Sequence, residues 1–563
     1  MENVRKVAYF SMEIGIVSEI PTYAGGLGVL AGDSIRSAAD LKLPLVAMTL
    51  LHRTGYFTQT LDVHSGQNES PTNWQIENFL VEESARVSVQ LENRTVQIRV
   101  WKYEVQGVSG FRIPVYFLDT NLPENSEYDR SLSDYLYGGD RHYRLCQEAI
   151  LGIGGIRMLR ALGYHQLEIF HLNEGHSSFL TLELLDEHMK QRGRASFQHE
   201  DLEAVRKKCV FTTHTPVLAG HDRFPIDQVR HVIGRYEIFE LEDVFRWEGT
   251  INMTHLALHF SHYANGVSKR HAEVSKRLFS GFTIDAITNG VHAAFWTTKP
   301  FQALFDRHIP GWRVDNYSLK QAVTFPHHEI WEAHAQAKHD LLDVVEEKAG
   351  VKFESEAFTI GYARRFTAYK RPDLLFADIQ TLKRLAEQFG TIQLVFAGKA
   401  HPHDHHGKEL LKRVLELRGK MQRIQLVVLE NYDINLGRVI TAGVDLWLNN
   451  PDPPLEASGT SGMKAALNGV PSLSVLDGWW TEGWIEGITG WAIDEKIVGT
   501  TEENDMPFEA TSIYQKLEHI ILPLYYRNRT QYIEVMRQTI GHSGAFFNTQ
   551  RMIQQYLAKA YSW

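Results

Sequence analysis

A single lysine at the start of an expected helix is the residue with the most specific chemistry in this sequence. The stretch PPLEASGTSGMKAALNG (453–469) places Glu456 ahead of a turn of small residues, and Lys464 follows within the first turns of the helix. A lysine held in a desolvated pocket near other cations has a lowered pKa and can form a Schiff base with an aldehyde cofactor. The alternative is an ordinary surface lysine, so the other motifs must decide between the two.

A glycine-rich turn near the N-terminus could hold an anion. In TYAGGLGVLAGDS, Gly25, Gly26 and Gly28 lie between an expected strand and an expected helix. Glycines there let backbone N–H groups approach an anion, and the helix N-terminus adds partial positive charge. The spacing is not G-x-G-x-x-G, so a dinucleotide is not implied, and such a turn can equally be structural.

The stretch GYARRFTAYKRPD predicts a second anion site. Four cations follow the end of an expected strand: Arg364, Arg365, Lys370 and Arg371. A run of cations is usually a solvated face. However, the ends of parallel strands line ligand clefts, and arginine suits bidentate phosphate binding. We therefore favour a phosphate site here.

Further polar residues end or follow strand-like runs, where cleft residues belong. They are Asp140 in LYGGDRHYR, Asn173, Glu174 and His176 in FHLNEGHSSF, His214 in FTTHTP, and Asn289 in AITNGVHAAFW. Each histidine alone is more often structural than catalytic, so the argument depends on their occurring together. The stretch HPHDHHG (401–407) could be a metal cluster, but we interpret it as a solvated loop and expect no metal.

The elements that would position these residues alternate between strands and helices. Short β-branched or aromatic runs are followed by glycine-rich turns and helical patterns, which predicts the α/β class with two doubly wound parallel sheets. Residues 287–312 break this rhythm with Pro300 and Pro310, so we place a domain boundary near 295. A cleft between the two halves should hold the site, because α/β sheets bind ligands at the carboxyl ends of their strands.

Composition fits a globular protein of two to four domains: of 563 residues, 43% are hydrophobic and 22% are charged. The formal charge of −10 argues against nucleic acid as the main ligand. Two cysteines, Cys146 and Cys209, cannot form a disulfide framework, which fits a reducing compartment. No apolar run is long enough for a signal peptide or a membrane span, so we expect a cytoplasmic location.

The order of these motifs resembles that of the α-glucan phosphorylase family, whose members act on glycogen, starch and maltodextrin. The resemblance begins with YFSMEIG and GGLG, continues through HLNEGH, THT, INMTHLALHFSHYANGVSKRH, TNG and RRFTAYKR, and ends with LENYDINLGRVITAGVDLW, EASGTSGMKAALNG and GAFFNTQRMIQQYLAKAY. It therefore covers nearly the whole chain. The most specific motif is EASGTSGMKAALNG, because its counterpart in the family carries the lysine that binds pyridoxal 5'-phosphate, and Lys464 matches that lysine.

The resemblance implies an α/β fold of two Rossmann-like domains that face a central cleft, the GT-B glycosyltransferase fold. The expected parts are a glucan-binding N-terminal domain (1–295), a pyridoxal-phosphate domain (296–540) and a C-terminal helix (541–563) that crosses back to the N-terminal domain. A homodimer is also suggested. Because the chain starts almost at the first strand, we expect no N-terminal regulatory segment and a constitutively active enzyme without allosteric control.

The functional positions of the family map onto this sequence motif by motif. Lys464 would form the Schiff base, and the cofactor phosphate would be held by the backbone at Gly26 and by Arg364 and Thr460. Tyr432 and Trp296 would line the cofactor pocket, while Arg365 and Lys370 would bind the substrate phosphate. The glucosyl unit would be surrounded by Leu27, Asp140, His214, Asn289, Glu456, Ser458 and Gly459, with Glu174 and His176 nearby. The catalytic residues would be Arg365, Lys370, His214 and Lys464.

The implied reaction is phosphorolysis of an α-1,4-glucan by inorganic phosphate to α-glucose 1-phosphate, with retention of configuration. The phosphate group of the cofactor would relay a proton to the substrate phosphate. Such chemistry needs two phosphate groups in one water-poor cleft, and their mutual repulsion explains the cations at the strand ends.

The sequence departs from the family pattern at three places. The phosphate motif Arg-Ile-His-Glu-Tyr-Lys-Arg is Arg365-Phe-Thr-Ala-Tyr-Lys-Arg here, Gly-Asn-Met-Lys is Ser461-Gly-Met-Lys464, and Gly139 replaces an asparagine before Asp140. These departures leave the cofactor expectation in place. They affect the contacts expected on the acceptor side and to the glucose hydroxyls.

Two other functions stay open from the sequence. A nucleotide-sugar-dependent glucan synthase has the same fold and a similar GGL loop, but such enzymes usually carry a lysine before the two glycines, where Ala24 stands here. A non-catalytic glucan-binding protein would not need the cation cluster and Lys464 together.

Overall fold

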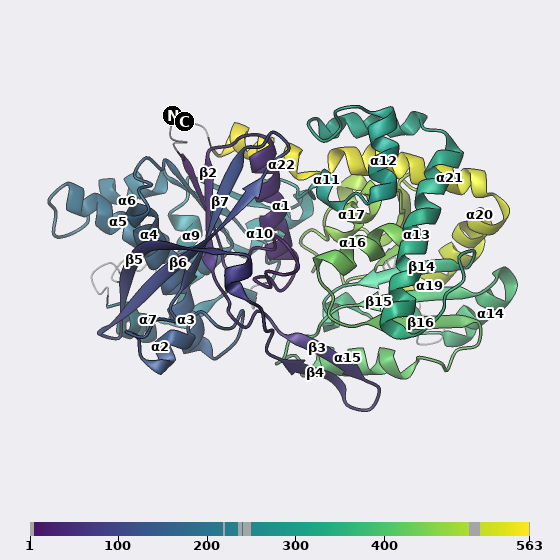
Figure 1. Ribbon diagram of the computed structural model, residues 1–563, viewed down its shortest axis with the longest axis horizontal. Coiled ribbons are helices and arrows are strands. Elements are labelled where there is room, and N and C mark those ends of the chain that lie inside the picture. The colour runs from purple at the N-terminus through teal and green to yellow at the C-terminus, as the bar shows by residue number, and fades with distance from the viewer. Residues whose placement is uncertain (1–4, 218–219, 235–238, 240–248, 495–506, 562–563) are drawn as a thin grey trace. The chain divides into compact units, whose positions relative to one another are not determined.

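The computed structural model describes residues 5–217, 220–234, 239, 249–494 and 507–561. The chain divides into two compact units (Figure 1). The first unit contains residues 1–57, 71–288 and 552–563, and the second contains residues 58–70 and 289–551. Both units are α/β, as the sequence predicts.

The first unit is built on a nine-stranded sheet. Its strands, in spatial order, are β13 (Asp285–Ala286), β12 (Tyr263–Gly266), β9 (Cys209–Thr212), β8 (Ile169–Asn173), β1 (Val7–Ser11), β2 (Leu45–Leu50), β7 (Arg112–Asp119), β6 (Arg94–Gln106) and β5 (Val81–Leu91). The strands from β13 to β7 are parallel, while β6 and β5 add an antiparallel hairpin that the sequence did not predict.

Helices cover both faces of this sheet. Strand β1 alternates between two apolar clusters, with Phe10 in one and Tyr9 in the other. The Phe10 cluster includes residues of α3, α4 and α5, and the Tyr9 cluster includes residues of α1 and α22. The helices assigned from the start of this unit are α1 (Gly26–Asp40), α2 (Glu127–Ser131), α3 (Arg141–Ala149), α4 (Gly155–Ala161), α5 (Leu180–Gln191), α6 (His199–Arg206), α7 (Ile226–Ile233), α9 (Met253–His259) and α10 (Lys269–Leu278), with the short strands β10 (Arg223–Pro225) and β11 (Thr250–Asn252).

The second unit is built on a six-stranded parallel sheet. The spatial order is β16 (Ile424–Leu429), β15 (Ile392–Ala397), β14 (Phe358–Ala363), β17 (Leu446–Asn449), β18 (Ser472–Val475) and β19 (Gly490–Ile493). The strand order reverses at β14 and β17, because successive strands are added on opposite sides of this pair. Ligands of open α/β sheets bind at the carboxyl ends of the strands beside such a switch point.

The helices of the second unit are α11 (Ala293–Trp296), α12 (Lys299–His308), α13 (His327–Ala349), α14 (Ile379–Phe389), α15 (His405–Glu416), α16 (Ile434–Gly443), α17 (Ser461–Leu467), α18 (Trp480–Gly483), α19 (Phe508–Lys516), α20 (Leu522–Arg527) and α21 (Arg529–Thr539). Helix α22 (Thr549–Lys559) starts in this unit, and its residues from Met552 onward belong to the first unit.

An N-terminal hairpin also belongs to the second unit. Strands β3 (Thr58–Asp62) and β4 (Gly66–Ser70) lie beside α15 (Figure 1). The amide of Gln59 donates to the carbonyl oxygen of Gly398 at 2.9 Å, and that of Gln67 donates to the carbonyl oxygen of Ala400 at 2.9 Å. These partners are more than 330 residues away in the chain, so no local sequence pattern predicted the hairpin.

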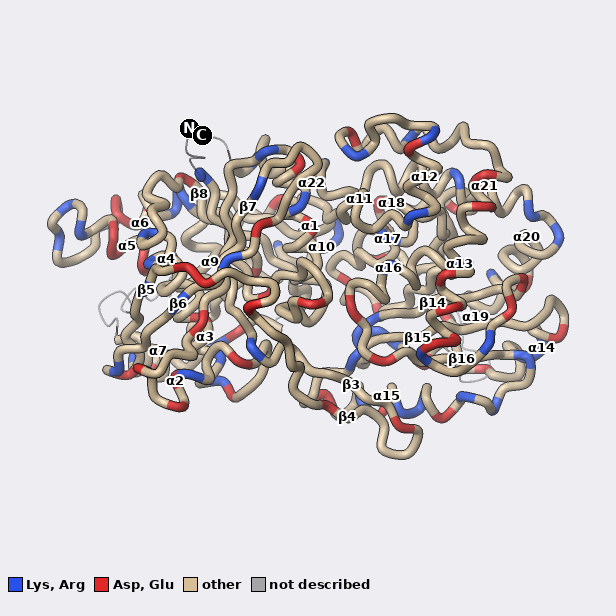
Figure 2. The backbone as a smooth tube through the Cα atoms, viewed as in Figure 1, with Lys and Arg blue, Asp and Glu red and all other residues tan. Residues whose placement is uncertain are grey.

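Charged residues of both signs alternate along each unit (Figure 2). The formal charge of −10 is therefore not gathered in one acidic segment of the described chain. Within the described residues, no helix has both the length and the apolar character that crossing a membrane requires.

Candidate functional site

The glycine-rich turn of the first unit wraps around a buried carboxylate. Oε2 of Glu13 accepts the N–H of Ala24 at 2.6 Å and that of Gly25 at 3.2 Å. A Cβ at Gly28 would lie 2.7 Å from the same oxygen, so only glycine fits there. Helix α1 then begins with Gly26 and Leu27, whose N–H groups belong to the unpaired first turn and can face a ligand. Glu13 was not predicted as a site residue.

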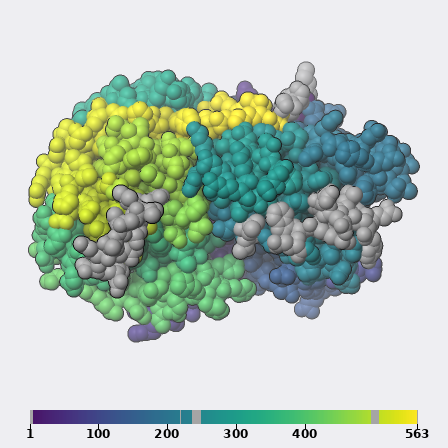
Figure 3. Space-filling view, turned by 180° about the vertical axis from the view of Figure 1, so that it is seen from behind, coloured from purple at the N-terminus to yellow at the C-terminus, as the bar shows by residue number. Residues whose placement is uncertain are grey.

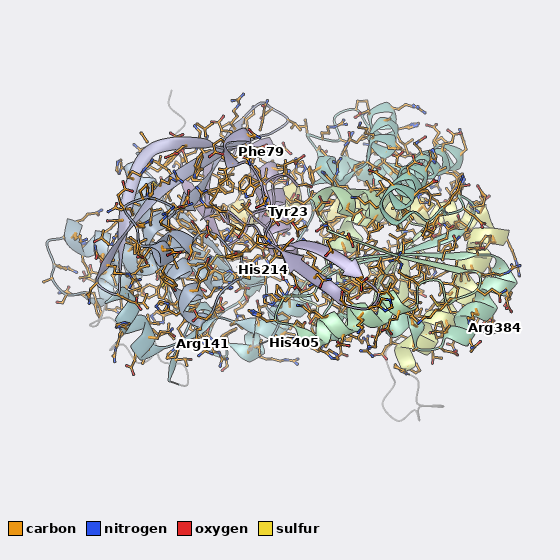
Figure 4. The ribbon with its side chains drawn as sticks, turned by 60° about the horizontal axis from the view of Figure 1, so that its bottom comes forward. Tyr23, Phe79, Arg141, His214, Arg384 and His405 are labelled. Carbon is orange, nitrogen blue, oxygen red and sulfur yellow. The ribbon has the colours of Figure 1, made fainter. Side chains whose placement is uncertain are left out.

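The residues Asn173, Glu174 and His214 meet at the ends of β8 and β9. Nε2 of His214 lies 2.7 Å from Oδ1 of Asn173, and the backbone N–H of His214 donates to Oε2 of Glu174 at 2.8 Å. Glu174 has a φ of +74°, a left-handed conformation that is strained for a residue with a side chain. The side chain of Glu174 accepts hydrogen bonds from the Thr215 hydroxyl at 3.0 Å and from the Gly175 N–H at 3.1 Å, and these bonds stabilise the conformation. Figure 4 labels His214 and, from the glycine-rich turn, Tyr23.

Glu174→Gln is expected to flatten the pH dependence of stability in the weakly acidic range. Burial raises the pKa of Glu174 from 4.5 to about 7 against the opposing hydrogen bonds, so in this window the folded state keeps a proton that the unfolded state has released. The free energy of unfolding of the wild type therefore falls as pH rises through the window, by about 3 kcal/mol in total.

Urea unfolding at about pH 5 and about pH 8 measures this difference. The exposed Glu124→Gln is the matched control and should keep the wild-type slope. A Glu174→Gln protein with an unchanged slope would contradict the assignment.

The sequence did not predict a cluster of ionisable residues formed by Arg144, Glu148, His176 and Asp222. Nη2 of Arg144 donates to Oδ2 of Asp222 at 2.7 Å, and Nε2 of His176 lies 3.4 Å from the same oxygen. Glu148 is fully buried and accepts Nε of Arg144 at 3.3 Å, and burial followed by the charge of Asp222 raises the pKa of Glu148 well above its usual range. The guanidinium of Arg144 also lies 4.6 Å from the ring centre of Tyr137.

Tyr137 connects this cluster to the glycine-rich turn. Its hydroxyl donates to Oε1 of Glu13 at 2.9 Å, and its φ of +55° is left-handed. The loop continues to Gly139, where a Cβ would lie 2.6 Å from the ring of Tyr143. The Cβ of the asparagine expected from the family pattern would therefore clash with Tyr143 at its present position. Asp140 is exposed and caps α3 by accepting the N–H of Tyr143 at 2.8 Å, a structural contact.

In the second unit, three predicted residues form one buried ion-pair group at the β14–β17 switch point. Oε2 of Glu456 accepts both Nη2 of Arg364 and Nζ of Lys370. All three residues are buried. Burial alone would raise the pKa of Glu456, but the charges of Arg364 and Lys370 lower it to about 2, so the carboxylate is ionised.

The other two cations of the predicted group lie differently. Arg365 is exposed. Arg371 donates to the carbonyl oxygens of Asn450 and Pro451 at 3.0 and 2.8 Å, so it supports the loop after β17.

Lys464, Trp296 and Tyr432 also come together in the second unit. Nζ of the buried Lys464 lies 3.9 Å from the ring centre of Trp296. A Cβ at Gly437 of α16 would lie 2.9 Å from the hydroxyl oxygen of Tyr432 and 3.6 Å from the ring of Trp296, so both aromatic residues pack against this glycine. Nδ2 of Asn468 donates to the carbonyl oxygens of Trp296 and Lys464 at 2.9 and 3.0 Å, which fixes α17 against α11.

The turn before Lys464 is held by the segment after β18. The N–H of Glu456 donates to Oδ2 of Asp477 at 2.8 Å, and the N–H of Trp479 donates to the carbonyl oxygen of Ser458 at 2.9 Å. Gly459 has a φ of +81°, which favours glycine, and Thr460 leads directly into α17.

Several predicted ligand residues carry buried polar atoms without a hydrogen-bond partner among the described residues. In the second unit these atoms are Nη1 of Arg364, Oγ of Ser458 and Oδ1 of Asn289, and in the first unit Nδ1 of His176 is another. Buried polar groups are normally paired, so such atoms indicate a ligand or water. By their chemistry, the guanidinium of Arg364 suits a phosphate oxygen, and the hydroxyl of Ser458 and the amide oxygen of Asn289 suit sugar hydroxyls.

The histidine-rich stretch has a structural role in the described chain. Asp404 caps α15 by accepting the N–H of Gly407 at 2.8 Å, and His403, His405 and His406 are exposed. No group of three or more potential metal ligands occurs in the part of the chain that the structure describes.

Comparisons with known proteins give two matching families. A family model described as carbohydrate phosphorylase matches residues 237–482, and one described as the starch synthase catalytic domain matches residues 16–289. The chain is 39% identical to a maltodextrin phosphorylase from Thermococcus litoralis, covering 99% of this chain and 70% of the relative. It is 34% identical to a glycogen phosphorylase from Aquifex aeolicus, covering 99% and 86%. An uncharacterized protein of Methanocaldococcus jannaschii is 31% identical and is covered completely.

Proposed function

Because this chain belongs to the carbohydrate phosphorylase family and is an α-glucan phosphorylase, we propose that it cleaves α-1,4-glucans with inorganic phosphate, retains the configuration and releases α-glucose 1-phosphate. The observation that carries this proposal is that the second unit combines unpaired buried polar atoms, an ion-pair group at the β14–β17 switch point and a buried lysine. A hydrolase would need neither the two buried cations on Glu456 nor the buried amine of Lys464.

Pyridoxal phosphate fits the residues around Lys464. Lys464 would bind the cofactor, Trp296 and Tyr432 would enclose its ring, and its phosphate would be held by Arg364, Thr460 and the backbone at Gly26. When bound, pyridoxal phosphate supplies a second phosphate group that can exchange a proton with the substrate phosphate. The unpaired Nη1 of Arg364 supports this assignment, because a guanidinium suits a phosphate oxygen.

The substrate phosphate would be bound by Arg365 and Lys370. Lys370 is a point charge fixed by Glu456, whereas Arg365 is exposed and its fork can follow an incoming phosphate. Their positive charges offset the repulsion between two phosphate groups. They also keep the substrate phosphate anionic beside the anomeric carbon, where positive charge develops in the transition state.

The glucosyl unit would be bound by residues with sugar-compatible groups. Both cations bond to Oε2 of Glu456, so Oε1 can accept a sugar hydroxyl. Oγ of Ser458 and Oδ1 of Asn289 can pair with further hydroxyls. Leu27, Gly459, Asp140, His214, Glu174 and His176 complete the proposed set. We infer the GT-B arrangement for the two units, and the expected homodimer stays a prediction.

The second candidate is a nucleotide-sugar-dependent glucan synthase, because the starch synthase model matches residues 16–289. The geometry of the first unit argues against it. The position where such enzymes carry a lysine is Ala24, whose N–H is bonded to the carboxylate of Glu13. Alanine offers no cation to the nucleotide phosphates.

The proposal is tested by incubating the protein with maltodextrin and inorganic phosphate and measuring α-glucose 1-phosphate. Arg365→Ala is expected to lower kcat/KM for phosphate by about 100-fold or more, because it removes a charge from the transition state. The matched control is Arg384→Ala, an exposed arginine of the second unit that pairs with Glu518 (Figure 4). A wild type that releases no sugar phosphate, or an Arg365→Ala variant as active as the control, would refute the proposal.

A further inference from the structure

His214, which is proposed to bind the glucosyl unit, and its hydrogen-bond partner Asn173 lie at the end of a row of polar side chains on one sheet face. His171 and Asn173 are two residues apart in β8, so their side chains point to the same face of the sheet. Asn173 is opposite Thr212 in the register between β8 and β9. Nε2 of His171 lies 2.9 Å from Oγ1 of Thr212. Two residues further along the chain from Thr212, His214 contacts Asn173 at 2.7 Å. The row therefore leads from the sheet interior to the site.

The C-terminal part of the chain covers this face. Met552, Ile553, Tyr556 and Tyr561 pack in the apolar cluster of the first unit that contains Tyr9. A cavity of about 10 Å³, large enough for about one water molecule, is lined by these residues together with His171, Asn173 and His214. The outer side of the C-terminal helices is at the molecular surface (yellow in Figure 3). The inner side of α22 therefore lines the same cavity as His214 and Asn173.

A closed ring of hydrogen bonds joins α22 to the sheet. Nδ2 of Asn265 lies 3.1 Å from the hydroxyl oxygen of Tyr556, that oxygen lies 2.9 Å from Oγ1 of Thr212, and Thr212 donates to Oδ1 of Asn265 at 3.0 Å. Because Nδ2 of Asn265 also donates to the carbonyl oxygen of Gly266 at 3.1 Å, the amide orientation is fixed. The direction of the ring follows: Asn265 donates to Tyr556, Tyr556 to Thr212, and Thr212 to Asn265.

This direction decides the tautomer of His171. The single hydroxyl proton of Thr212 is donated to Asn265, so the Thr212 oxygen must accept the Nε2–H of His171. Burial lowers the pKa of His171 to about 3, so the ring is neutral and carries a single N–H. Nδ1 is then an acceptor, and the hydroxyl of Tyr561 donates to it. Every donor in the network is used once.

We propose that Tyr561, with Tyr556 beside it, is a positioning residue for His214. Tyr561 orients the imidazole of His171, and Tyr556 orients the hydroxyl of Thr212. His171 and Thr212 lie near the carboxyl ends of β8 and β9, which are followed by the contact between Asn173 and His214. The inference depends on the proposed function, in which His214 faces the glucosyl unit. It assigns Tyr556 of α22 and Tyr561, which follows the helix, an indirect part in catalysis.

Tyr561→Phe and Tyr556→Phe test the proposal, because each removes one hydroxyl and keeps the ring. Each variant is expected to lower kcat for maltodextrin phosphorolysis by about tenfold through displacement of the sugar. The KM for phosphate should change by less than about twofold, because the proposed phosphate residues lie in the other unit. The matched control is Tyr263→Phe, whose hydroxyl donates to Asp285 at 2.7 Å in the same unit and outside the network.

A double-variant cycle separates positioning from general loss of stability. If Tyr561 acts through His171, the effects of Tyr561→Phe and His171→Gln on kcat will not add, whereas Tyr263→Phe and His171→Gln will add. If Tyr561→Phe lowers kcat no more than Tyr263→Phe while the wild type makes α-glucose 1-phosphate, the positioning role is wrong and the proposed function stands. A wild type without phosphorolysis would overturn both.

Discussion

Lys464→Ala is expected to yield a protein without bound pyridoxal phosphate and with phosphorolysis lowered by about a thousandfold or more. The amine is buried, lies 3.9 Å from the ring centre of Trp296, and sits on a helix that Asn468 fixes to residue 296. Removing it takes away the anchor that would hold the cofactor phosphate against the cations. Absorbance of the purified protein and release of α-glucose 1-phosphate measure the two losses.

Lys464→Arg is the matched control for charge. It keeps a cation over the indole of Trp296, so the fold and its cation–π contact should be preserved. A guanidinium does not react as an amine, so this variant should be as inactive as Lys464→Ala. A Lys464→Ala protein that keeps more than about a tenth of the wild-type rate would show that the lysine is only structural.

The alternation of strands and helices predicted the α/β class, because the spacing of apolar residues and the glycine-rich turns are local signals. It did not predict β3–β4 or β5–β6. In β5 exposed and more buried residues alternate, a pattern typical of a strand with one solvated face, but nothing local identifies its partner. The polar segment around Gln59 reads as a loop, since its hydrogen-bond partners near Gly398 are distant in sequence.

The sequence could predict which charged residues follow strand ends, because position after a strand is a local signal. Arg364, Lys370 and Glu456 meet at the β14–β17 switch point, and Lys464 lies in α17, which follows β17 in the chain. The sequence could not predict that Glu456 bonds both cations, because 86 and 92 residues separate these partners. The carboxylate of Glu13 was visible as a charged residue inside an apolar run, a signal that could have identified it.

The cluster around Asp222 had no such signal. Arg144 lies on a helix whose polar residues look like a solvated face, yet it pairs with Asp222 and Glu148 in the interior. Only packing reveals that Glu148 is fully buried. Buried polar networks of this kind depend on distant partners, so they are derived from structure rather than from spacing.

Asp445→Leu is expected to destabilise the second unit by about 3–5 kcal/mol, because it leaves a buried cation without its partner. Oδ2 of Asp445 accepts Nζ of Lys338 and the N–H of Thr359, both at 2.7 Å, and Oδ1 lies 2.9 Å from Nε2 of His334. Burial alone would raise the pKa of Asp445, but Lys338 and His334 lower it. This stabilisation is therefore present at neutral pH and is lost as pH falls through the lowered pKa.

The double variant Asp445→Leu with Lys338→Met should recover most of the loss, since no buried charge is then left unpaired. The N–H of Thr359 donates to Asp445 at 2.7 Å and would lose this acceptor, so recovery should be incomplete. The exposed Asp343→Ala on the same helix, α13, should change stability by less than about 1 kcal/mol. Urea unfolding followed by tryptophan fluorescence compares the three. A single Asp445→Leu variant as stable as Asp343→Ala would mean that the network is solvated and that α13 is held to β14 and β17 by apolar packing alone.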